Sequence, residues 1–293
     1  MTASNQIKMN ALPSTPSLLL RAAITRKSPG KMSPAKPPVF PDTVITVDNI
    51  NIDTTQLQRY RQVCGFATHS PYLPMSFLHV LAFRLQLAMM LRKEFPVAPM
   101  GMVHLSNTLR QYRPIEATEK PSLRCRISDS WLSSKGVEFT FICSAYIGQD
   151  KVWEDESLYL TRMKTGIAKD KTERPALQEF EHREPWQLCP EQARQYAKAS
   201  GDYNPIHLHN LSAKLLGFKK MIIHGMWSQA ACISALEASV GERSECYAEF
   251  KTPVFLPATL QFCYQQSEQG IDFGLRNESG DKPHVEGYFR PLA

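Results

Sequence analysis

Two long stretches of the chain are apolar on most sides, and each is followed by runs in which apolar and polar residues alternate. The first stretch, residues 75–93, contains neither Gly nor Pro. The second, residues 225–240, is rich in Ala, Leu and Met, and Gly241 fits a helix C-terminus. A helix that is apolar on most sides is typical of a protein core. The pattern therefore predicts two buried central helices.

The alternating runs after each helix predict two sets of strands. Alternation with period two is the mark of a half-buried strand, as in residues 137–141. The expected strands are 102–112, 123–131, 137–147 and 152–161 in the first set and 246–251, 259–266, 271–277 and 284–290 in the second. A central helix followed by an antiparallel sheet occurs in both halves. The fold class predicted is α+β, with one unit duplicated along the chain.

Two polar or Pro-rich segments divide the chain. Residues 1–42 contain seven prolines and are predicted to be a flexible, basic tail with at most one docked helical turn at 18–23. Residues 167–185 are polar and charged, which is typical of a linker. The expected folding units are therefore 43–166 and 186–293.

The excess of positive charge comes entirely from the N-terminal tail. The sequence has 34 Lys and Arg against 28 Asp and Glu, a net charge of +6. Six of the bases and none of the acids lie in residues 1–40: Lys8, Arg21, Arg26, Lys27, Lys31 and Lys36. The remainder is formally neutral, which argues against a nucleic-acid-binding protein, because such proteins concentrate positive charge on a folded face.

Other compositional features favour a cytoplasmic protein without a transmembrane segment. Seven cysteines occur without C-x-x-C spacing, as in a reducing compartment. No uninterrupted apolar run is long enough to cross a bilayer. An organelle transit peptide is the minor alternative, which Pro13 and Pro16 disfavour because they interrupt an amphipathic helix.

One short phrase of the sequence contains several side chains that can take part in acid–base chemistry. Residues 200–207 read Ser-Gly-Asp-Tyr-Asn-Pro-Ile-His, so a turn brings Asp202, Asn204 and His207 together within six residues. Asp and His are the usual acid–base pair, and Asn can hold a water or orient a carboxylate. Gly225 stands at the expected start of the second helix, where an unpaired backbone N–H and close approach of a ligand would suit an oxyanion hole.

Simpler interpretations of the same residues stay open. Asp202, Asn204 and Pro205 are all turn formers and can serve only that purpose. A metal site built from His207, His209 and His224 lacks the carboxylate or Cys that would complete a recognised ligand spacing, so no metal is expected. His224 is predicted to be a core histidine bonded to backbone. The remaining histidines are predicted to be structural or surface residues: His69, His79, His104, His182 and His284.

The phrase around Asp202 resembles a known family. Together with Gly217-Phe218, His224-Gly225-Met226 and the run 250–257, it is similar to the MaoC-like (R)-specific enoyl-CoA hydratase and acyl dehydratase family. That family has the hotdog fold, a long helix wrapped by an antiparallel sheet. The resemblance covers 186–293. Residues 43–166 look like a diverged hotdog unit without the phrase, as in double-hotdog members of the family.

The resemblance implies a reaction and residue roles. Asp202 and His207 match the catalytic pair, Asn204 the supporting Asn, and Gly225 the backbone donor to a thioester carbonyl. The implied reaction is reversible hydration of a trans-2-enoyl thioester to an (R)-3-hydroxyacyl thioester. No metal or organic cofactor is implied. Coenzyme A is the expected carrier, and an acyl carrier protein is the alternative.

Three further residues are candidates for contact with the substrate. Lys219 and Lys220 are candidates for the phosphates of coenzyme A, although solvated surface lysines are the simpler interpretation. Met226 is a candidate substrate-binding residue. His209 departs from the family, because many relatives have an acidic residue there. Apolar residues of the first helix are expected in the core, or in an acyl tunnel: Phe77, Leu78, Leu81, Leu85 and Met89.

Rival functions remain at this point. A duplicated fold can lose its chemistry, which would leave a non-catalytic acyl-thioester binding protein. A hotdog thioesterase is the enzyme rival, but it needs water at the thioester carbon and not at the β carbon. The chain is expected to be either a monomeric pseudo-dimer or a homodimer.

Overall fold

The computed structural model describes residues 5–25, 27, 38–168, 176–239 and 241–292. The chain forms two compact units, and neither is continuous in sequence. The first comprises 1–51, 79–107 and 119–175, and the second comprises 52–78, 108–118 and 176–293. Residues 52–78 and 108–118 thus group with the C-terminal part of the chain. The division into folding units 43–166 and 186–293 stays a prediction.

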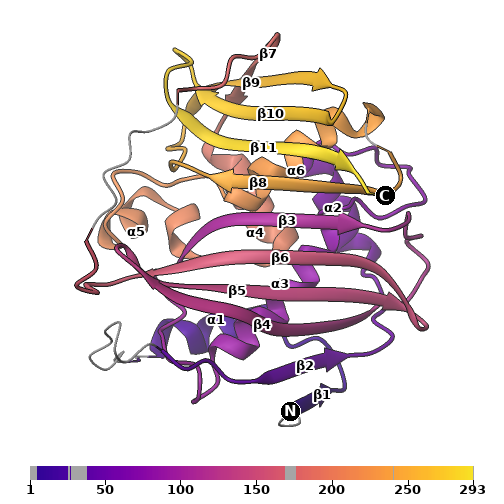
Figure 1. The fold of residues 1–293 in the computed structure, drawn as a ribbon, viewed down its shortest axis with the longest axis vertical. Coiled ribbons are helices and arrows are strands. Elements are labelled where there is room, and N and C mark those ends of the chain that lie inside the picture. Colours follow the sequence, from indigo (N-terminus) through magenta and orange to yellow (C-terminus); the bar gives the residue numbers. More distant parts are fainter. Residues whose placement is uncertain (1–4, 26, 28–37, 169–175, 240, 293) are drawn as a thin grey trace. The chain divides into compact units, whose positions relative to one another are not determined.

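Among its described residues, the first unit has six strands that lie side by side in a sheet, and a central helix. Its strands are β1 (Asn5–Met9), β2 (Thr43–Val47), β3 (Val103–Gln111, of which 103–107 belong here), β4 (Ser122–Ser133), β5 (Gly136–Ile147) and β6 (Asp150–Arg162). The strand order is β1-β2-β4-β5-β6-β3, and β4, β5 and β6 pair antiparallel (Figure 1).

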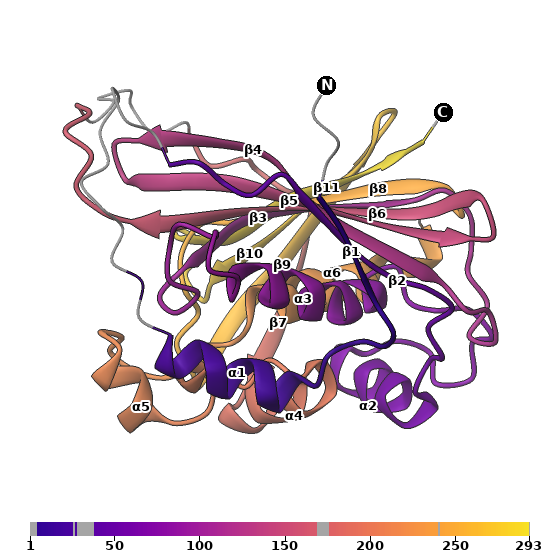
Figure 2. The same cartoon turned by 90° about the horizontal axis from the view of Figure 1, so that it is seen from below.

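Helix α3 (Phe77–Met90) lies against one face of this sheet (Figure 2). It has neither Gly nor Pro, and Leu81, Leu85 and Met89 are at most 4% exposed. The predicted helix at 75–93 is therefore confirmed, with ends two or three residues shorter. The apolar residues of this helix that were expected in the protein core or an acyl tunnel are all buried: Phe77, Leu78, Leu81, Leu85 and Met89.

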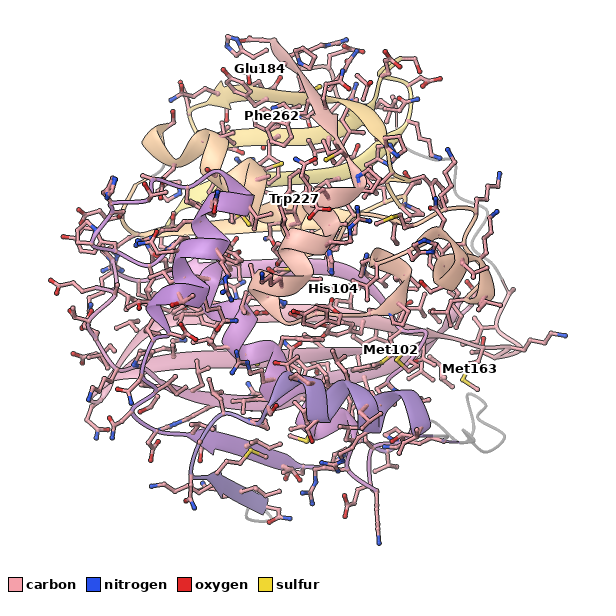
Figure 3. All side chains as sticks on the ribbon, turned by 180° about the vertical axis from the view of Figure 1, so that it is seen from behind. Met102, His104, Met163, Glu184, Trp227 and Phe262 are labelled. Carbon is pink, nitrogen blue, oxygen red and sulfur yellow. The ribbon has the colours of Figure 1, made fainter. Side chains whose placement is uncertain are left out.

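A polar cluster is buried between α3 and the sheet of the first unit. The His79 imidazole bonds to the Asp155 carboxylate, which also accepts from Asn107 Nδ2 at 2.9 Å and Ser157 Oγ at 2.6 Å. His104 (Figure 3) lies beside His79, with ring centroids 5.9 Å apart, and burial lowers the pKa of His104 to about 3. Several donors offset the desolvation of the carboxylate. His79 and His104 are therefore buried in this cluster, and their purely structural role stays a prediction.

The N-terminal segment differs from the expected flexible tail. Asn5–Met9 form β1, which pairs parallel with β2, and Thr15–Ile24 form helix α1. Pro16 occupies the first turn of α1, where proline is favoured, and Leu18 is only 3% exposed. The Lys27 ammonium donates to three backbone carbonyls at and after the end of α3, those of Met90, Arg92 and Phe95. Lys31, Lys36 and the prolines of 28–37 lie outside the described residues.

The second unit repeats the plan of helices and an antiparallel sheet. Its helices are α2 (Thr54–Cys64), α4 (Pro190–Ser200), α5 (Asn210–Leu215) and α6 (Gly225–Leu236). Its strands are β7 (His182–Leu188), β8 (Ser244–Phe250), β9 (Ala258–Ser267), β10 (Gly270–Asn277) and β11 (Pro283–Pro291), in the order β8-β11-β10-β9-β7 (Figure 1). The predicted helix at 225–240 is confirmed as α6, which ends at Leu236, and residue 240 lies outside the described residues. The four predicted strands of this half are confirmed as β8 to β11.

Part of the expected linker is a strand. Residues 182–185 open β7, which pairs antiparallel with β9 from His182 opposite Tyr264 to Leu188 opposite Ala258. The sequence did not predict this strand because it contains charged side chains and Pro185. Both are tolerated on a strand at the edge of a sheet. Residues 169–175 lie outside the described residues.

Helices α2 and α4 carry the same spacing of three residue types. The sets are Gln56, Tyr60 and Gly65 in one and Gln192, Tyr196 and Gly201 in the other. Both glycines end their helices in the left-handed conformation, with φ of 86° and 81°. The following residue is Phe66 after α2 and Asp202 after α4. This spacing supports a duplication in which only the second copy has an acid at that position.

Among the described residues, no helix is both long and apolar enough to cross a membrane.

Candidate active site

The C-terminal end of α4 fixes the start of the polar phrase. Gly201 leaves the helix with φ of 81°, a conformation that favours glycine, and Asp202 follows at once. Ser200 Oγ donates to the Tyr196 carbonyl at 2.8 Å and accepts from the Asp202 N–H at 3.1 Å. Asp202 is therefore held by its own backbone and by the last turn of α4.

The turn after Asp202 is built from its own side chains. Asp202 Oδ1 accepts from the Asn204 N–H at 3.2 Å, and Asn204 Oδ1 accepts from the Ile206 N–H at 3.4 Å. The second bond caps the short 3₁₀ helix Pro205–His207. Asp and Asn commonly make such bonds two residues on. The turn carries His207 back toward Asp202.

His207 is buried and oriented by a backbone carbonyl. Its Nδ1 lies 2.9 Å from the Ile222 carbonyl oxygen, which can only accept, so Nδ1 carries the proton and neutral Nε2 keeps its lone pair. Burial lowers the pKa of His207, while the Asp202 charge and the Ile222 bond oppose that shift. At neutral pH the residue is therefore a neutral imidazole with one basic nitrogen.

His224 packs face to face with His207. The ring centroids are 3.6 Å apart with an interplanar angle of 24°. His224 Nε2 donates to the Asp202 backbone carbonyl at 3.0 Å and lies 3.9 Å from its carboxylate. Burial, and next the proximity of His207, hold the pKa of His224 well below its ordinary value. The prediction of a core histidine bonded to backbone is confirmed.

The three side chains could also be considered as metal ligands. Asp202, His207 and His224 each offer a ligand atom, and these atoms lie within 4.8 Å of one another. However, each imidazole uses one ring nitrogen to donate to a backbone carbonyl, and a ligand nitrogen must present a lone pair. Only the other nitrogen of each ring is available. The absence of a metal from the site stays a prediction.

Gly225 begins α6 directly after His224. The N–H groups of the first turn have no intrahelical acceptor and lie at the positive end of the helix dipole. A Cβ at this position would lie 3.0–3.2 Å from ring carbons of Phe250, which is closer than normal packing. Glycine therefore lets the helix start against Phe250. The side chains of Asp202 and His207 lie together, and Gly225 directly follows His224, which stacks on His207.

The part of the chain that carries these residues also matches the model of a known protein family. Residues 171–287 match the model of the MaoC-like domain. The chain contains a MaoC-like domain. The resemblance noted in the sequence is thereby confirmed.

Relatives extend the similarity of this chain beyond the MaoC-like domain. The chain is 29% identical over 257 residues to 3-hydroxyacyl-thioester dehydratase X of Mycobacterium tuberculosis, covering 86% of this chain and 91% of the relative. A crystal structure of HtdX from that organism superposes with a TM-score of 0.76 at 29% identity, covering 84% and 99% of the two chains. A MaoC-like dehydratase from Phytophthora capsici superposes with a TM-score of 0.68 at 19% identity, which shows the fold alone. The α+β hotdog fold is confirmed.

The other candidate residues of the MaoC-like domain differ in exposure. Met226 is 8% exposed in the first turn of α6. Lys219 and Lys220 are exposed, which fits solvated lysines, and their contact with coenzyme A stays a prediction. His209 caps α5, because its Nδ1 accepts from the Leu211 N–H at 3.2 Å. His209, which departs from the family pattern, therefore has a local role as a helix cap.

Two features of the site could not be found from the polar phrase. The Ile222 carbonyl fixes the tautomer of His207, but every residue has a carbonyl and no sequence signal marks this one. Helix α2, which lies within the stretch 43–166 that the sequence predicted to be a separate unit, packs on α4 and α6. The Gln-Tyr-Gly spacing shared with α4 is the signal that could have pointed to α2.

Proposed function

We propose that the chain is a hydro-lyase that interconverts (R)-3-hydroxyacyl thioesters and trans-2-enoyl thioesters. The observation that carries the proposal is the bond from His207 Nδ1 to the Ile222 carbonyl, because it leaves Nε2 as a base beside the Asp202 carboxylate. The relative at 29% identity, named 3-hydroxyacyl-thioester dehydratase X, supports the same reaction class.

The proposed step in the hydration direction uses one water. The Gly225 N–H binds the thioester carbonyl oxygen and stabilises the enolate-like charge that develops on it. The water oxygen bonds to the β carbon while His207 Nε2 takes one of its protons. The Asp202–His207 pair then delivers one proton to the α carbon. The balance is H and OH added across the double bond, and dehydration is the reverse.

The carrier and cofactors are part of the proposal. Coenzyme A is the proposed carrier, with an acyl carrier protein as the alternative for the same chemistry. The step uses only side chains and the backbone of the MaoC-like domain, with neither metal nor organic cofactor.

The test is hydration of trans-2-enoyl-CoA substrates of several chain lengths, followed by loss of enoyl absorbance and chiral analysis of the product. His207→Asn removes the basic nitrogen and is expected to lower kcat by about 10²-fold or more. Asp202→Asn is expected to have a similar effect. The matched control is His209→Asn, because Asn also caps helices and His209 is exposed.

The outcomes separate the proposal from its rivals. Turnover that gives the (R) product, is lost in His207→Asn and is kept in His209→Asn would support it. A folded protein that hydrates neither CoA-linked nor carrier-protein-linked enoyl substrates would contradict it and favour a binding protein. Release of free thiol from saturated acyl thioesters would instead identify a thioesterase.

A further inference from the structure

Helix α2 makes a hydrogen bond to the segment that carries the acid and the base. Gln56, in its first turn, donates through Nε2 to the Ala199 carbonyl oxygen at 2.8 Å. Ala199 is buried in the last turn of α4, three residues before Asp202. The end of α4 that sets the direction of the Asp202 turn is therefore tied to α2.

The other end of α2 makes a hydrogen bond to the helix that carries the backbone donor. The Trp227 indole N–H donates to the Val63 carbonyl oxygen at 2.8 Å. Trp227 (Figure 3) is only 4% exposed and lies two residues after Gly225, in the first turn of α6. The start of α6 is therefore tied to α2 as well.

The body of α2 between these two bonds is firmly packed. Tyr60 and Tyr196 are 1% and 2% exposed, with ring centroids 6.0 Å apart, so the aromatic rings of α2 and α4 meet in the core. The Tyr60 hydroxyl donates to Ser76 Oγ at 2.8 Å. Gln56 and Val63 are seven residues apart, which corresponds to about 10 Å along a helix. One rigid element thus joins both halves of the site.

We propose that α2 is a positioning helix for the active site, with Gln56 and Trp227 as its positioning residues. The inference rests on the proposed function. The base acts at the β carbon while Gly225 binds the carbonyl oxygen of the same substrate, so the two groups must keep a fixed separation. Neither residue reaches the reacting atoms. Each sets that separation through α2, and residues 54–64 belong functionally to the MaoC-like domain.

The test uses substitutions that remove one hydrogen bond each without adding charge. Gln56→Met keeps the length of the side chain, and its matched control is Gln58→Met, because Gln58 on the same helix donates to the Thr68 carbonyl away from the site. Trp227→Phe keeps an aromatic ring, and its control is Trp186→Phe on β7. We expect Gln56→Met and Trp227→Phe each to lower kcat by about 10-fold with little change in KM, since small misplacements of reacting groups are costly.

The pH profile and the double variant give readouts that a general loss of stability would not move. Asp202 raises the pKa of His207, so a displaced Asp202 turn should move the acidic limb of kcat/KM to lower pH in Gln56→Met. The double variant should lose less than the product of the two single losses, because both bonds set one distance.

Amide hydrogen exchange tests the inference without turnover. Faster exchange in residues 200–208 of Gln56→Met and in residues 224–228 of Trp227→Phe, with the control variants like wild type, would support it. Unchanged exchange and unchanged kcat, or equal losses in the controls, would overturn it. If the wild type hydrates no enoyl thioester, the proposed function fails, and the exchange data alone decide whether α2 positions these segments.

Discussion

At the scale of residues, the site depends on two histidines that burial keeps neutral. Each has one ring nitrogen bonded to a backbone carbonyl, that of Ile222 for His207 and that of Asp202 for His224. A neutral imidazole can accept a proton, whereas an imidazolium cannot. The fold therefore sets the protonation state that the proposed chemistry needs.

The pH dependence of hydration follows from this. His207 must be neutral to act as base, and its folded pKa is lowered below 6.5, with burial as the main cause. The active form therefore persists as pH falls through 6.5 and is lost only below the lowered pKa. We expect the acidic midpoint of kcat/KM below 6.5, measured on a trans-2-enoyl-CoA. A midpoint at or above 6.5 would show that another group limits the rate or that His207 is not the base.

At the scale of elements, apolar helices were predictable and short or charged elements were not. The central helices stood out because their apolar residues leave no polar face. Strand β7 was not predicted because its composition is mostly polar and charged and includes Pro185, and helix α1 was predicted only as one docked helical turn at 18–23. The stability of β7 comes from pairing and that of α1 from docking. Asp202 and His207 were found because a turn brings them together locally. The Ile222 carbonyl and helix α2 depend on long-range contacts, which no local pattern encodes.

Docking of α1 can be tested with two leucines of the same helix. Leu18 is 3% exposed and Leu20 is 68% exposed. Leu18→Ala should lower the free energy of unfolding by about 2–4 kcal/mol, because it removes buried methyl groups and leaves a cavity. Leu20→Ala should change it by less than about 0.5 kcal/mol. Denaturant unfolding measures both, and equal small effects would favour the flexible tail predicted from the sequence.

At the scale of the whole molecule, each compact unit is assembled from separated parts of the chain. The second unit contains residues 52–78 and 108–118 as well as 176–293. Its helices α2 and α4 pack together around Tyr60 and Tyr196. The half of the chain that lacks the polar phrase thus supplies structure to the half that has it.

This assembly predicts the behaviour of a C-terminal fragment. Residues 176–293 without α2 would expose the face of α4 that carries Tyr196 and Ala197, which are at most 2% exposed in the full chain. We expect the fragment to lose cooperative unfolding and hydratase turnover, and a peptide of residues 52–78 to restore part of both. Circular dichroism during heating and the enoyl-CoA assay measure these properties. A fragment that unfolds cooperatively and is fully active would contradict the expectation.

The stacked imidazoles also limit how many protons the site can store. When His207 takes a proton, its positive charge faces the ring of His224 at 3.6 Å, and a second proton there is opposed by repulsion and by burial. The stacked pair therefore favours a single proton over two. Hydration as proposed removes one proton from water and returns one to carbon in each turnover, so one proton on the pair at a time suffices for the reaction.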